Sequence, residues 1–84
     1  MRARPRFVRK PRKVMGAYIA AHHYSGHSRL ERRIPPGEIW IRADAWKDPR
    51  IWTHEMVEWN LMRHGVPYRR AHRAANKFEK HVRT

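Results

Sequence analysis

The chain has 84 residues, which is enough for one small domain and leaves no room for a second hydrophobic core. It contains no Cys, which excludes disulfides, cysteine-ligated zinc, iron–sulfur clusters and thiol catalysis. With 20 Lys and Arg against 7 Asp and Glu, the net charge is +13, which favours polyanions such as RNA, DNA or an anionic membrane surface.

The first 13 residues carry much of this charge. They hold seven basic residues and no acid, so they supply +7 of the total and leave +6 for the rest. Pro5 and Pro11 interrupt the segment, and its apolar surface is too small to fold alone. We therefore predict a flexible arm over residues 1–13, which either stays solvated or lies along phosphate groups. Its basic residues are Arg2, Arg4, Arg6, Arg9, Lys10, Arg12 and Lys13.

Residues 14–42 predict a small amount of β-structure. Val14–Tyr24 is apolar with β-branched and aromatic members, a pattern that fits either a strand or a short helix. The Pro-Pro-Gly run at 35–37 is a turn signal. Glu38–Arg42 is predicted to be a strand that pairs across this turn with Leu30–Ile34.

Two features of this region bear on binding. His22 and His23 would point to opposite faces of a strand, so they are not expected to share a metal ion, and contact with a substrate beside a metal site is their alternative role. Trp40 lies on the opposite face of its strand from Ile39 and Ile41. We expect the four tryptophans to be core residues, and Trp40 is for this reason the best candidate for an exception that stacks on a nucleic-acid base.

The second half of the chain predicts two helices. Asp48 and Pro49 form a capped helix start, and Gly65 ends the helix at about His64. A second helix begins at Pro67 and reaches about Val82. The short connection implies an antiparallel hairpin. The predicted fold is α+β: an N-terminal β-hairpin or small sheet packed on an antiparallel two-helix hairpin, with residues 14–84 as one domain after the basic arm.

Histidines and glutamates interrupt the apolar stripes of both helices. His54 and Glu58 are four residues apart and share one face of the first helix. In the second helix, His72 and Glu79 likewise interrupt the apolar stripe. Burying such groups costs several kcal/mol unless they are paired or bound to a metal ion.

The hairpin can be set in register by counting from its turn. Glu58 is seven residues before Gly65 and His72 is seven after it, so these two side chains should face each other. His54 then lies one turn away, with Glu79 just beyond it. The sequence therefore predicts that two imidazoles and at least one carboxylate converge between the helices.

This donor set suits zinc or another divalent metal, with His54, Glu58 and His72 as ligands. Glu55 follows the first histidine and is the candidate general base, which would take a proton from water. Glu79 would be either a fourth ligand that closes the site or an acceptor that orients His72. The alternative is a structural set of Glu–His hydrogen bonds without metal.

The run His54-Glu55-Met56-Val57-Glu58 resembles the H-E-x-x-H helix of zincin metallopeptidases, with Glu in place of the second His. Over residues 37–80 the chain is similar to small uncharacterised phage and archaeal proteins. They share an H-E-x-x-E helix, a Gly turn, a Tyr-x-x-Ala-His helix (here Tyr68 to His72) and a downstream Glu. This resemblance implies a zincin-like metal site and names no substrate. The replaced His leaves peptidase activity open.

The leading expectation is therefore a minimal zincin-like metal-binding protein that hydrolyses a peptide or amide bond with zinc. The alternative is a small basic nucleic-acid-binding or ribosome-associated protein, in which the His/Glu cluster is a structural metal site or a polar pair. A virion component that touches packaged nucleic acid is a third reading. In these readings the arm is joined by a basic face of the second helix, made of Arg69, Arg73, Lys77 and Lys80.

The hydropathy pattern bears on location. No apolar run approaches the roughly 18 residues needed to span a bilayer. We therefore expect no membrane span and a location in the cytoplasm, or in a virion if the protein is viral.

Overall fold

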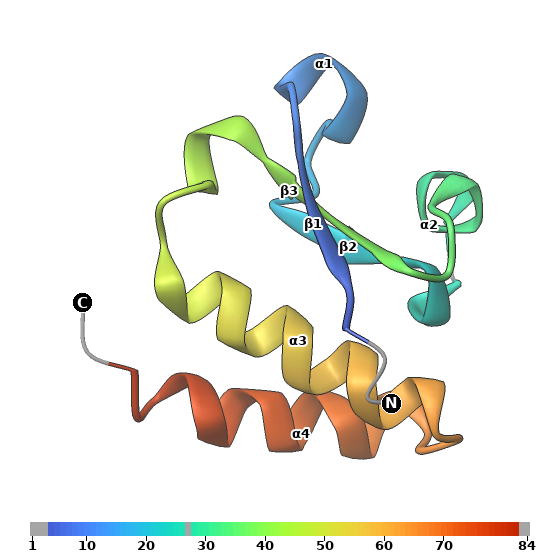
Figure 1. Ribbon diagram of the computed structural model, residues 1–84, viewed down its shortest axis with the longest axis vertical. Coiled ribbons are helices and arrows are strands. Elements are labelled where there is room, and N and C mark those ends of the chain that lie inside the picture. Colours follow the sequence, from blue (N-terminus) through green and yellow to red (C-terminus); the bar gives the residue numbers. More distant parts are fainter. Residues whose placement is uncertain (1–3, 27, 83–84) are drawn as a thin grey trace.

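A computed structural model, which describes residues 4–26 and 28–82, has three short strands and four α-helices (Figure 1). The strands are β1 (Arg6–Lys10), β2 (Ala20–His22) and β3 (Glu38–Arg42). The helices are α1 (Arg12–Met15), α2 (Arg29–Arg33), α3 (Pro49–Arg63) and α4 (Tyr68–Glu79), with one-turn 3₁₀ helices at His23–Ser25 and Ala43–Ala45. The predicted α+β class, with a small sheet on a helix hairpin, is confirmed.

The sheet has the order β1-β3-β2, with β3 in the centre. β1 runs parallel to β3, with Phe7 opposite Ile39. β2 runs antiparallel to β3, with His22 also opposite Ile39. Because side chains alternate along a strand, this register places His22 on the same face of the sheet as Ile39 and Ile41.

Both faces of this sheet are buried. On one face Trp40 packs with Met15, Ala21 and Ile34, beneath α1 and α2. On the other face Ile39 and Ile41 pack against Trp59 of α3. Figure 1 shows α3 and α4 side by side below the sheet and α1 above it. The helix hairpin therefore forms a layer against the face on which His22 lies.

The burial of Trp40 corrects its expected role. Its side chain is 7% exposed, its Nε1 atom donates to Glu38 Oε1 at 2.9 Å, and the Lys10 ammonium lies 4.3 Å from its ring centroid. The prediction assumed that one face of the strand is open to solvent. Because α1 and α2 cover that face, Trp40 is a core residue and offers no stacking surface.

The flexible arm is also corrected in part. Residues 6–10 form β1, an ordered strand of the sheet, and residues 12–15 form α1. Phe7 stacks on Trp52 with ring centroids 4.2 Å apart, and Val8 packs into the opposite core cluster. Pairing with β3 supplies the apolar burial that this segment lacks by itself. Arg4 is exposed, and Arg2 lies outside the described residues.

Leu30–Ile34 is not the predicted strand. Most of it belongs to α2, which begins at a reciprocal cap: the Glu31 amide donates to Ser28 Oγ, and the Ser28 amide donates to Glu31 Oε1, both at 3.1 Å. This capping box favours a helix over pairing across the Pro-Pro-Gly turn. Val14–Tyr24 was expected to be either a strand or a short helix, and it contains parts of both. Its first residues belong to α1, and its last belong to β2 and the following 3₁₀ helix.

The helix hairpin follows its sequence signals. Asp48 Oδ1 accepts from the Arg50 amide at 3.0 Å, and Pro49 occupies the first turn of α3. Gly65 follows the helix with φ of +92°, a conformation that favours glycine. Ala71 and Ala75 of α4 are buried, and their small side chains permit close packing on α3.

α4 is shorter than expected and ends at Glu79, three residues before Val82. Within the ranges that the structure describes, no helix has the length and apolar character to cross a membrane.

The ordered β1 strand makes a testable prediction. Phe7→Ala should lower the free energy of unfolding by about 2 kcal/mol, because it removes a half-buried ring from the contact with Trp52. Arg9→Ala, at an exposed position of the same strand, should change it by less than about 0.5 kcal/mol. Urea unfolding followed by tryptophan fluorescence measures both. Equal, negligible effects would restore the flexible-arm interpretation.

Candidate metal centre

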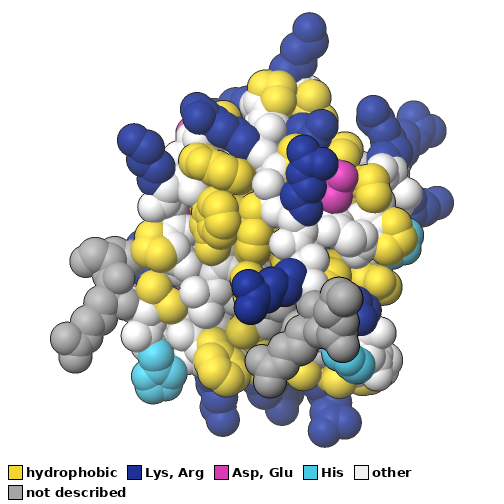
Figure 2. Space-filling view, viewed as in Figure 1, with side chains coloured by type: hydrophobic (Ala, Val, Ile, Leu, Met, Phe, Trp, Pro, Cys, Tyr) yellow, Lys and Arg dark blue, Asp and Glu magenta, His cyan; other side chains and the backbone are white. Residues whose placement is uncertain are grey.

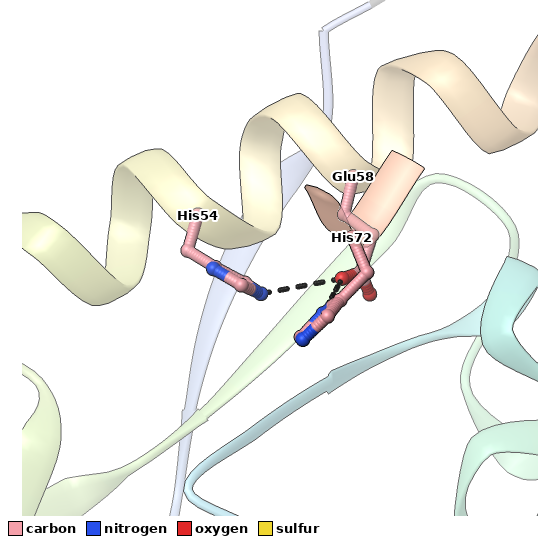
Figure 3. Close-up of side chains that lie close together, drawn as sticks. All are labelled: His54, Glu58 and His72. Carbon is pink, nitrogen blue, oxygen red and sulfur yellow. Dashed lines mark hydrogen bonds and ion pairs between the residues drawn. The ribbon is translucent and has the colours of Figure 1, made fainter. Parts of the chain in front are cut away.

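The Glu58 carboxylate is the centre of a buried polar cluster. Its side chain projects from the middle of α3, and the residue is 3% exposed. Its Oε2 atom lies 3.2 Å from His54 Nε2 and 3.0 Å from His72 Nδ1 (Figure 3). The predicted pairing of Glu58 with His72 across the hairpin is confirmed, as is the position of His54 one turn away.

Two helices position these side chains. His54 and Glu58 share a face of α3 because they are one helical turn apart. His72 reaches the carboxylate from α4, and its ring meets the His54 ring edge-on with centroids 5.0 Å apart. Tyr68 stacks on His72 at 5.2 Å and limits the orientations of that ring.

His22 is a member of the cluster that sequence reasoning missed. It is fully buried at the end of β2, and its Nε2 atom lies 2.9 Å from Glu58 Oε1 and 3.2 Å from Ser25 Oγ. The separation of His22 from His23 is correct, since the His23 Nδ1 atom donates to the Ile34 carbonyl oxygen instead. In the sequence, the only sign of this role is that His22 follows the small apolar pair Ala20-Ala21. The side chain faces α3 because of the antiparallel register of β2 on β3, which the sequence does not reveal.

Glu79 contacts His54, whereas the sequence assigned it to orient His72 or to close the site. Its Oε1 atom accepts from His54 Nδ1 at 2.8 Å. This bond occupies one ring nitrogen and leaves Nε2 directed at Glu58. A carboxylate behind a ligating histidine in this way fixes the tautomer and orientation of the ring.

Glu55, the candidate general base, is buried beside this cluster. It is 8% exposed, and its Oε2 atom lies 3.9 Å from His54 Nε2. Among the described residues no group donates a hydrogen bond to its carboxylate. Burial raises the pKa of Glu55 to about 8, and the nearby charge of Glu58 adds to the effect. Without a cation, this carboxyl group therefore keeps its proton near neutral pH.

The neighbouring carboxylate behaves in the opposite way. Burial alone would raise the pKa of Glu58, but hydrogen bonds from His22, His54 and His72 outweigh it and hold the pKa well below its usual range. The same contact with Glu58 raises the pKa of His54, despite the opposing effect of burial. The cluster thus has an ionised centre surrounded by imidazoles, with a protonated acid at its edge.

A pocket of about 250 Å³ opens onto the cluster. Glu55, Glu58 and Glu31 all contribute to its wall, together with His54 and His72. Glu31 is buried, with its Oε1 atom bound to the Ser28 amide. A solvent-accessible space therefore meets three carboxyl groups and two imidazoles.

The donor atoms fit a divalent metal ion. One ligand atom each from His54, Glu58 and His72 lies within 4.8 Å of the others. Ligand atoms about 2.0–2.1 Å from a tetrahedral zinc ion lie about 3.4 Å from one another, so small side-chain shifts suffice. His22, Glu55 and Glu58 form a second group that meets the same limit.

Most of the predicted phosphate-binding residues that the structure describes are exposed, but they are dispersed; Lys10 is partly buried over the Trp40 ring. Arg69, Arg73 and Lys77 are exposed on α4 and Lys80 directly follows it, while Arg12 and Lys13 are exposed on α1, across the sheet. Lys and Arg side chains surround the face drawn in Figure 2, without forming one continuous patch. The structure therefore brings the His/Glu residues together but not the basic ones.

Comparisons with family models, curated proteins and solved structures give no significant match. The resemblance to H-E-x-x-E proteins stays a prediction from the motif.

The buried charge of Glu58 leads to a stability prediction for chelator-treated protein. Glu58→Ala should lower the free energy of unfolding by about 3 kcal/mol, because it removes the buried carboxylate that His22, His54 and His72 all contact. Glu79→Ala is the matched control: it removes a partly exposed carboxylate and should cost less than about 1 kcal/mol. Urea unfolding measures both variants. Equal losses would contradict a central role for Glu58.

Proposed function

We propose that this protein is a minimal zincin-like metal-binding protein that uses zinc to hydrolyse a peptide or amide bond. The observation that carries the proposal is the convergence of His54, Glu58 and His72 on one point between α3 and α4. Two imidazoles and one carboxylate form the three-ligand set of hydrolytic zinc sites, which keep a fourth position open.

The surroundings of the ligands support a site that works on a substrate. The pocket gives access from solvent, and the His72 side chain at its edge is 42% exposed. Glu79 accepts a hydrogen bond from His54 Nδ1. The other ring nitrogen, His54 Nε2, therefore faces Glu58 and the position proposed for the ion. A closed structural site would need a fourth side chain at the exposed side, and Glu79 is engaged behind His54 instead.

Glu55 has the position that the proposed reaction requires. Its carboxyl group lies in the pocket wall next to His54, where it can receive a proton from water and return it to a leaving amine. A bound zinc ion supplies Lewis-acid stabilisation of charge on a carbonyl oxygen and makes water a better nucleophile. A nearby cation also favours the ionised, basic form of Glu55.

The proposal predicts that protein purified without chelator holds at least one equivalent of zinc. His54→Ala should lower zinc affinity by at least about 10-fold, since even residues behind metal ligands have effects of this size. His64→Ala is the control, because this exposed histidine lies at the end of α3 and bonds to the Asn60 carbonyl oxygen. Elemental analysis after equilibrium dialysis measures both.

Two results would contradict the proposal. One is the absence of stoichiometric zinc, and the other is equal zinc retention by the His54→Ala and His64→Ala variants. The hydrolytic part has a separate readout, the cleavage of a quenched-fluorescent peptide library. It should be lost in chelator and in the Glu55→Gln variant.

Nucleic-acid binding is a second candidate, favoured by the four exposed basic residues along α4. Arg73→Ala with Lys77→Ala should flatten the slope of log affinity against log salt by about 2, because each phosphate contact contributes about 0.9 for duplex DNA. Arg32→Ala with Arg33→Ala removes the same charge from α2, beyond the sheet, and should leave the slope unchanged. Fluorescence anisotropy with a labelled duplex measures the slopes. Equal slopes for the two double variants would contradict a binding face on α4.

A further inference from the structure

The two oxygen atoms of Glu58 face different sets of donors. Oε2 lies near His54 Nε2 and His72 Nδ1, at 3.2 and 3.0 Å. Oε1 lies 2.9 Å from His22 Nε2, on a side chain that comes from the sheet. One carboxylate thus links a set on the helix hairpin to a second set that includes a strand residue.

Glu55 completes the second set. It is one helical turn from Glu58, and donor atoms of His22, Glu55 and Glu58 lie within 4.8 Å of one another. All three residues are buried, whereas His54 and His72 are only partly buried. The second set therefore lies deeper in the protein than the first.

The Glu55 carboxyl group points to a ligand at this deeper position. The Glu55 side chain is only 11% exposed, it lines the pocket, and no described residue donates a hydrogen bond to its carboxyl group. A buried polar group without a partner costs free energy, and a buried carboxylate costs more. Its closest described ion-pair partner, His54 Nε2, is 3.9 Å away and faces Glu58 at 3.2 Å.

The geometry points to a two-metal centre in which Glu58 bridges two divalent cations. The outer ion is held by His54, His72 and Glu58 Oε2, and the inner ion by His22, Glu55 and Glu58 Oε1. This inference rests on the proposed zinc site, adds a second ion to it, and makes Glu55 a ligand of that ion in place of the general base. Imidazole and carboxylate ligands suit zinc, and manganese where carboxylate predominates.

The charge and size of the pocket agree with two ions. Glu31 brings a third buried carboxyl group to the wall, and cations bound there would favour the ionised forms of these groups. A volume of about 250 Å³ also leaves room for water beside the ions. Paired ions about 3.5–4 Å apart hold a substrate oxygen and a water molecule together in many hydrolases. In this centre Glu55 is a metal ligand.

The number of ions bound tests this inference without an activity assay. Chelator-stripped protein is titrated with Zn²⁺ in a calorimeter, and the loaded protein is then dialysed and analysed for metal. We expect two equivalents for the wild type and one for Glu55→Gln, which keeps the shape of the side chain. His72→Ala should also bind one, and Glu58→Ala should bind none tightly. His23→Ala, next to His22 but bonded elsewhere, should keep two.

Mn²⁺ loading gives an independent check on Glu58. Two ions that share one carboxylate are magnetically coupled, so the electron paramagnetic resonance spectrum of the wild type should show coupling. The spectrum of Glu55→Gln should be that of an isolated ion. Uncoupled spectra at a loading of two equivalents would overturn the bridge.

The outcomes separate this inference from the proposed function. One equivalent in the wild type, retained by Glu55→Gln and lost in His72→Ala, overturns the inner site and leaves the outer zinc site intact. If the wild type binds one equivalent that is lost in Glu55→Gln but retained by His72→Ala, both the two-metal centre and the proposed outer zinc site are overturned. The absence of binding has the same consequence.

Discussion

The buried carboxylate of Glu58 is the constraint on which the rest of the site depends. A charge on a 3% exposed residue is unfavourable unless neighbouring groups compensate it, and three imidazoles from three parts of the chain do so. These contacts join β2, α3 and α4. Without a metal ion the cluster is a structural element, and its donor atoms lie close enough together to hold one.

The small core has to hold this cluster in place. The helix hairpin buries one face of the sheet by packing Trp59 against Ile39 and Ile41. The Trp59 Nε1 atom also donates to the Pro36 carbonyl oxygen at 2.9 Å. β1 extends the same face, where Phe7 stacks on Trp52. Part of the basic N-terminal segment therefore supports the layer that carries Glu58. Phe7 and Val8 pack into the two core clusters, while Arg6 and Arg9 of the same strand are exposed.

Local patterns predict some of this arrangement. Helix periodicity and the position of Gly65 are enough to place Glu58 opposite His72, because residues equidistant from the turn lie side by side in an antiparallel hairpin. The capping box at Ser28 is also a local signal, and it indicates a helix where a strand was predicted over Leu30–Ile34. Long-range pairing is different. The contact between His22 and Glu58 spans 36 residues and depends on the antiparallel register of β2. The parallel pairing of β1 likewise has no short-range signal.

The central claim is that Glu58 and its histidines ligate zinc. X-ray absorption spectroscopy at the zinc edge of the loaded protein tests this most directly. We expect nitrogen and oxygen donors at about 2.0–2.1 Å, with outer-shell scattering from imidazole rings that weakens in the His54→Ala variant. A shell of oxygen atoms alone, unchanged by that substitution, would contradict it.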